Sequence, residues 1–123
     1  MDFSVKGNTL STDIFTITFE NLIEKVLTYE NIFVVLISIS DQVGMGRILG
    51  TIYDNIYGIT DKGSILWRIS SGDVPSDTYN HDNAFVNIYL DENNRFHAHG
   101  FFAGDSIFDP KTGRMLSRKS GSW

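Results

Sequence analysis

The spacing of apolar and polar residues along the chain predicts a mainly β protein. Ile32–Ile37 is a continuous apolar run, mostly β-branched, which is typical of a central strand covered on both faces. From residue 51 onward, short alternating segments are separated by polar turns, which predicts antiparallel strands in a meander. We therefore expect an antiparallel meander sheet, folded as an open sandwich or half-barrel.

Three polar turns set the limits of this meander. Asp61–Gly63 and Lys111–Gly113 each end in a glycine, which supplies the positive φ that a tight hairpin needs, and Asp91–Asn94 forms a third, four-residue turn. The flanking strands are predicted at residues 52–60, 64–70, 84–90, 95–102, 106–109 and 114–117. Alternation places Trp67 in the core with Ile65 and Ile69, and gives a common face to Val86, Ile88 and Leu90.

The first thirty residues give a weaker pattern. Two short strands are predicted, at 3–5 and 14–19. Residues 20–29 predict one short helix, since apolar side chains recur there at helical spacing, namely Leu22, Ile23, Val26 and Leu27.

Length and composition limit the classes of protein to consider. A chain of 123 residues predicts a single domain, 1–123, with a flexible tail at 117–123. The absence of cysteine excludes disulfides and thiolate metal sites. The N-terminal residues do not resemble a signal peptide, and no apolar run is long enough to span a membrane. We expect a cytoplasmic protein with no membrane partner and no cofactor.

The charge of the chain favours a basic protein as partner. Residues 1–110 carry fifteen acidic residues against six basic ones. Such a surface repels the phosphates of nucleic acids but accelerates association with a basic protein. A solvated acidic face that only aids solubility is the alternative. The candidate partner-binding residues are Asp73, Asp77, Tyr79, Asp82, Asp91, Glu92 and Asp105.

The order of the strands resembles a known group of proteins. The segments are "NIFVVLIS", "DNIYGITDKGSILWRI", "AFVNIYLDENNRFHAHGF" and "GDSIFDPKTGRML". Together they resemble small immunity proteins of bacterial toxin–immunity pairs, including those of contact-dependent growth inhibition, over about Glu20–Leu116. The resemblance implies a non-enzymatic protein that binds one cognate toxin, expected to be a basic nuclease, and neutralises it by steric and electrostatic block. It carries over no catalytic residues.

Two other interpretations stay open. His97 and His99 share one face of a predicted strand, as in some metal sites, so the chain could be a small β-barrel that binds a metal or acts as an enzyme. Arg95 lies on the same face and would disfavour a metal, so we expect exposed or partner-facing histidines. The third interpretation is a ligand-binding or scaffold domain that assembles as an oligomer, so that its open sheet edges pair between copies.

Overall fold

The fold contains strands and no helix in the residues that the computed structural model describes, which are 2–38, 54–69, 85–100 and 104–119. The strands are β1 (Ser4–Lys6), β2 (Thr9–Ser11), β3 (Thr16–Thr18), β4 (Ile23–Tyr29), β5 (Ile32–Ile37), β6 (Ile56–Thr60), β7 (Ile65–Arg68), β8 (Phe85–Leu90), β9 (Phe96–Gly100), β10 (Gly104–Phe108) and β11 (Met115–Lys119). They form three antiparallel sheets, ordered β1-β2-β3, β4-β5-β6-β7 and β11-β10-β9-β8, and none closes into a barrel. The mainly β, antiparallel prediction is confirmed.

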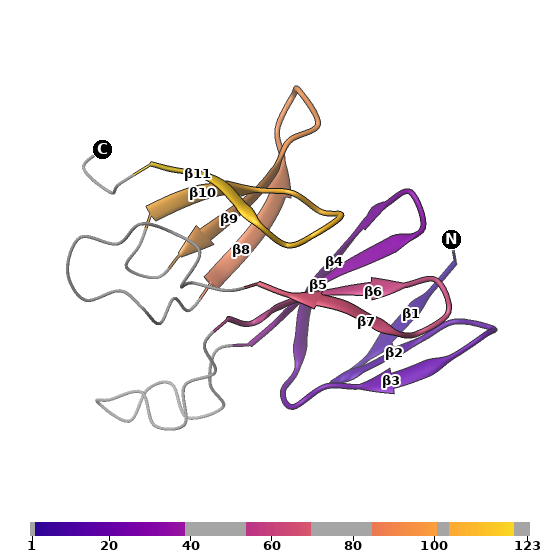
Figure 1. Ribbon diagram of the computed structural model, residues 1–123. Coiled ribbons are helices and arrows are strands. Elements are labelled where there is room, and N and C mark those ends of the chain that lie inside the picture. The colour runs from indigo at the N-terminus through magenta and orange to yellow at the C-terminus, as the bar shows by residue number, and fades with distance from the viewer. Residues whose placement is uncertain (1, 39–53, 70–84, 101–103, 120–123) are drawn as a thin grey trace, which may run out of the picture.

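The β4–β7 sheet lies between the other two sheets (Figure 1). One face of β5 packs through Ile32, Val34 and Leu36 into a core shared with the β8–β11 sheet. The other face packs through Phe33, Val35 and Ile37 against Leu10 and Phe19 of the N-terminal segment. Every residue of β5 is therefore buried, which confirms the predicted central strand covered on both faces.

The predicted hairpins join the strands as expected. Gly63 and Gly113 adopt φ values of +88° and +73°, and Asn94 in the third turn adopts φ 60°. Trp67 is buried in the core, as predicted, with its indole N–H donating to the Pro110 carbonyl at 2.8 Å. Ile65, at the start of β7, is mostly exposed despite its alternation with Trp67.

The predicted helix at residues 20–29 is wrong, because a bulge in β4 imitates helical spacing. The pairing with β5 shifts between Ile23 and Lys25, so one extra residue is inserted there. Ile23 and Val26, three residues apart, consequently face the same core, while Leu27 packs against the opposite one.

A second bulge, in β8, corrects the predicted face of Val86. The pairing with β9 shifts between Phe85 and Asn87, so Phe85 and Ile88 point inward and Val86 is exposed. Asn87 and Tyr89 consequently lie on the outer face of the β8–β11 sheet, where the candidate site is built.

The last strand ends two residues later than the predicted strand at 114–117. Strand β11 continues to Lys119 and pairs with β10, so residues 117–119 belong to the sheet and not to the predicted flexible tail. No helix in the described residues is long and apolar enough to cross a membrane.

Candidate functional site

A cluster of polar side chains, which we call the His97 network, occupies the outer face of the β8–β11 sheet. The strand register places Tyr89 opposite His97 in the β8–β9 pair, and Asp105 opposite His99 in the β9–β10 pair. Asp91 joins the cluster from the β8–β9 turn. Four segments of the chain, β8, the turn, β9 and β10, therefore contribute one side chain each.

His97 is held by two carboxylates, one on each ring nitrogen. Its Nδ1 lies 2.6 Å from Asp105 Oδ2, and its Nε2 lies 2.7 Å from Asp91 Oδ2. The Tyr89 ring stacks on the imidazole at 4.7 Å with planes 8° apart, and its hydroxyl donates to Asp105 Oδ1 at 2.9 Å. The His97 side chain is only 11% exposed as a result. The expectation of an exposed or partner-facing histidine is thus wrong for His97, and His99 is half-buried.

The network favours the charged forms of His97 and Asp91 and the neutral form of Tyr89. Burial lowers the pKa of His97, but the hydrogen bonds and charges of Asp91 and Asp105 outweigh it, so the pKa lies above the ordinary 6.5. The pKa of Asp91 falls well below 3.8, chiefly through its bond to His97. Burial and the bond to Asp105 raise the pKa of the Tyr89 hydroxyl. Below this raised pKa, His97 is therefore an imidazolium between two carboxylates.

Such a histidine is poorly suited to metal binding or general-base catalysis. Both chemistries need a nitrogen lone pair, and in the imidazolium both His97 nitrogens are donors. Among the described residues, no group of three or more His, Asp or Glu side chains could hold a metal ion. The described strands form open sheets, and none closes into the small β-barrel of that interpretation.

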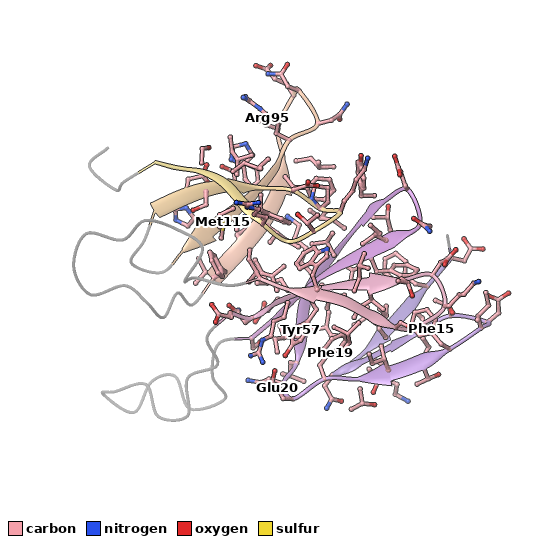
Figure 2. The ribbon with its side chains drawn as sticks, in the orientation of Figure 1. Phe15, Phe19, Glu20, Tyr57, Arg95 and Met115 are labelled. Atoms are coloured by element: carbon pink, nitrogen blue, oxygen red, sulfur yellow. The ribbon has the colours of Figure 1, made fainter. Side chains whose placement is uncertain are left out.

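Asp91 also fixes the β8–β9 turn. Its Oδ1 accepts the backbone N–H groups of Asn93 and Arg95 at 2.8 and 3.0 Å. Its Oδ2 accepts Arg95 Nε at 2.8 Å, and Figure 2 places Arg95 beside the tip of this hairpin. Glu92 is exposed in the same turn.

The structure thus divides the predicted partner-binding residues. It brings Asp91 and Asp105 together on His97 and leaves Glu92 apart in solvent. Asp73, Asp77, Tyr79 and Asp82 lie outside the described residues.

A second candidate, which we call the acidic hollow, was missed by the sequence analysis. It measures about 140 Å³ and is lined by Asp2, Thr12, Asp13, Ile14, Phe33 and Asp61. Thr12 Oγ1 accepts the N–H groups of Ile14 and Phe15, both at 3.1 Å, which fixes the β2–β3 turn with Ile14 69% exposed. Its three carboxylates come from separate segments, so only the fold brings them together.

A third cluster links the N-terminal segment to the central sheet. Tyr57 donates to Glu20 Oε1 at 2.5 Å, and Arg68 lies over the Tyr57 ring at 5.0 Å. Figure 2 shows Phe19, Glu20 and Tyr57 close together on the side of the molecule away from Arg95. Burial, followed by the bond to Glu20, raises the pKa of Tyr57 to about 12. None of its residues lines the acidic hollow.

Comparison with known proteins gives a family but no activity. A profile described as a domain of unknown function (DUF7957) matches residues 1–120, almost the entire chain. No curated protein and no solved structure matches the chain.

Proposed function

We propose that this chain, which belongs to the DUF7957 family, is an immunity protein that binds one cognate toxin and blocks it. The acidic hollow is the observation that carries this proposal. Three carboxylates, Asp2, Asp13 and Asp61, face a hollow with Phe33 and the exposed Ile14 beside them. The aliphatic stem and cationic head of a lysine or arginine would fit such a lining.

The state of the carboxylates supports a binding role at the hollow. In the described part of the chain, no hydrogen bond or ion pair occupies the side chains of Asp2, Asp13 or Asp61. Asp91 and Asp105, in contrast, are already bonded to His97. Of the carboxylates that the structure describes, those of the hollow are thus better placed to meet a partner than those of the His97 network.

The negative charge of this chain indicates what kind of toxin it would bind. A nuclease presents lysine and arginine to the phosphates of its substrate. A protein with an acidic surface can occupy that site in place of the nucleic acid and attract the toxin at long range. We therefore propose a basic nuclease as the partner, and the cytoplasm, where such a toxin would act, as the location.

The test begins with the partner and ends with matched variants. The full-length protein would be tagged, expressed in its source cells and captured at low salt, and native mass spectrometry would identify stoichiometric partners. Captured candidates would be purified and assayed for nuclease activity with and without this protein. Binding of a basic toxin at 1:1, with loss of its activity, supports the proposal. A metal-loaded protein, or a homo-oligomer that inhibits nothing, contradicts it.

Three double variants then locate the contact. D13N/D61N removes two charges from the hollow, D73N/D77N removes two from a segment outside the described residues, and E30Q/E92Q removes two from exposed turns. Because the change in net charge is equal, long-range attraction weakens equally in all three. We expect D13N/D61N to accelerate dissociation at least tenfold and E30Q/E92Q to alter only the association rate. Equal dissociation rates for these two variants would remove the hollow from the interface.

A further inference from the structure

We propose that His97 is a pH-sensitive latch, which ties the β8–β9 turn to β10 when it is protonated and releases the turn when it is neutral. The inference goes beyond the proposed function and does not depend on the identity of any partner. It rests on the geometry of one side chain that bridges two segments, through Asp91 of the turn and Asp105 of β10.

The geometry requires both ring protons. Each ring nitrogen lies within 2.7 Å of a carboxylate oxygen, which can only accept. An imidazolium offers an N–H to both oxygens, whereas a neutral imidazole has one N–H and one lone pair. Loss of the proton therefore turns one strong hydrogen bond into a repulsive contact between a lone pair and a carboxylate. It also removes the cation that lies between two anions.

The neighbouring groups decide which end of the latch opens. Tyr89 covers the ring and donates to Asp105, so Asp105 keeps a partner on β8. Arg95 and two backbone N–H groups also bind Asp91, but all of these belong to the same turn, and their protection from exchange depends on the turn staying against the sheet. His99 follows on the same face of β9, and Lys119 stands opposite Asp105 in the β10–β11 register. In the described part of the chain, His97 is the one partner of the Asp91 side chain that lies outside the turn, so the turn is the end that opens.

The hydrogen bonds from His97 to the two carboxylates determine whether the latch opens on raising or on lowering the pH, because they shift the pKa values of the bonded groups. The folded-state pKa of His97 is raised above 6.5, so its contribution is complete below pH 6.5 and is lost as the pH rises through the folded value. The pKa of Asp91 is lowered, so its contribution is complete above pH 3.8 and is lost only in strong acid. The latch is therefore closed in mildly acidic solution and opens as the pH rises toward the His97 pKa, which separates the Asp91 carboxylate from His97.

The sheet contains a matched control. The turn that follows β10 also begins with an aspartate, and Asp109 Oδ1 accepts the Lys111 N–H at 2.9 Å, much as Asp91 Oδ1 accepts the N–H groups of Asn93 and Arg95. No histidine bonds Asp109 among the described residues. A pH effect that acts through His97 must therefore change the β8–β9 turn and leave the turn after β10 unchanged.

The experiment is an NMR titration of the full-length protein with labelled histidine rings, combined with amide exchange. We expect His97 to titrate above 6.5. Between pH 6.5 and that midpoint, the protection factors of the Asn93 and Arg95 amides, corrected for intrinsic exchange, should fall by up to about tenfold per pH unit and then level off, while that of Lys111 stays constant. A His97 midpoint at or below 6.5, or an equal loss of protection in both turns, would overturn the latch.

Variants keep the test specific. H97Q has no titrating group at this position and should give low, pH-independent protection of the first turn, whereas H99Q should behave like the parent. If H97Q does not fold, D105N serves instead, because it removes one carboxylate and should move the opening of the turn to lower pH. An opening that keeps its midpoint in D105N would also contradict the proposal.

Discussion

The side-chain amide of Asn55 forms two hydrogen bonds with the backbone of Phe85, one as donor and one as acceptor. Asn55 Nδ2 donates to the Phe85 carbonyl at 2.8 Å, and Asn55 Oδ1 accepts the Phe85 N–H at 2.8 Å. The same Nδ2 also donates to the Ile37 carbonyl at 2.7 Å. Since Asn55 is fully buried, this one residue joins the end of β5 to the start of β8, and thereby joins two sheets.

We predict that N55A lowers the free energy of unfolding by about 3–5 kcal/mol, because it leaves the Ile37 carbonyl and the Phe85 carbonyl and N–H without these hydrogen-bond partners. N55D should be at least as destabilising, since a carboxylate would face two carbonyl oxygens. The matched control is N8A, which at a half-buried site removes one bond to a backbone group, from Asn8 Nδ2 to the Phe19 carbonyl, and one long bond from the Thr9 hydroxyl at 3.5 Å. Urea denaturation of the three variants checks the order, and a cost for N55A no larger than that for N8A would contradict it.

Gly113 lies against the face of Trp67. A Cβ on Gly113 would meet the indole at 2.4 Å, and φ there is +73°. We predict that G113A costs about 3 kcal/mol or more, from backbone strain and overpacking together. G7A is the control, because Gly7 has a similar φ of +62° but only one contact, at 3.8 Å, and should show the backbone cost alone, about 1–2 kcal/mol.

Fluorescence separates these two contributions in the glycine variants. Trp123 is replaced by phenylalanine throughout, so that Trp67 is the one tryptophan that remains. The indole should move toward solvent in G113A, with a red-shifted emission, and keep its emission in G7A. Equal unfolding midpoints and equal emission for both variants would show that the Trp67 contact is unimportant.

Much of the fold could be predicted from local pattern. The apolar run of β5 and the glycines at positions 63 and 113 carry their information in adjacent residues, because burial on both faces and positive φ are local demands. The bulges at Glu24 and Val86 were not predictable in this way, since an inserted residue shifts the phase of alternation. In β4 that shift produced the pattern of a helix.

The candidate sites were harder still to predict. The acidic residues were recognised as a group, but the binding of Asp91 and Asp105 to His97 depends on the β9–β10 register and on the turn. The alternation did place His97 opposite the core face. The burial of His97 could not be predicted, because it depends on the stacking of Tyr89. The bulge in β8 places Tyr89 on the same face as His97. Asp2, Asp13 and Asp61 are far apart in sequence and meet only in the folded chain.

Tyr57 gives a prediction for alkaline solution. Its folded-state pKa of about 12 exceeds the ordinary value of 10.0. The unfolded chain therefore releases this proton first, and the contribution of Tyr57 to stability is complete below pH 10 and is lost as the pH approaches 12. We expect the free energy of unfolding to fall across that range, and the tyrosinate absorbance to show a late step near pH 12 from Tyr57.

Y57F is the variant that isolates this effect. It should remove the late step in absorbance and flatten the alkaline decline, while it costs about 1–2 kcal/mol at neutral pH through loss of the bond to Glu20. E20Q keeps a neutral acceptor beside the hydroxyl and should move the late step to lower pH without removing it. If the late step survives in Y57F, the proton belongs to another tyrosine, and the link between Glu20 and Tyr57 does not control the alkaline stability of this fold.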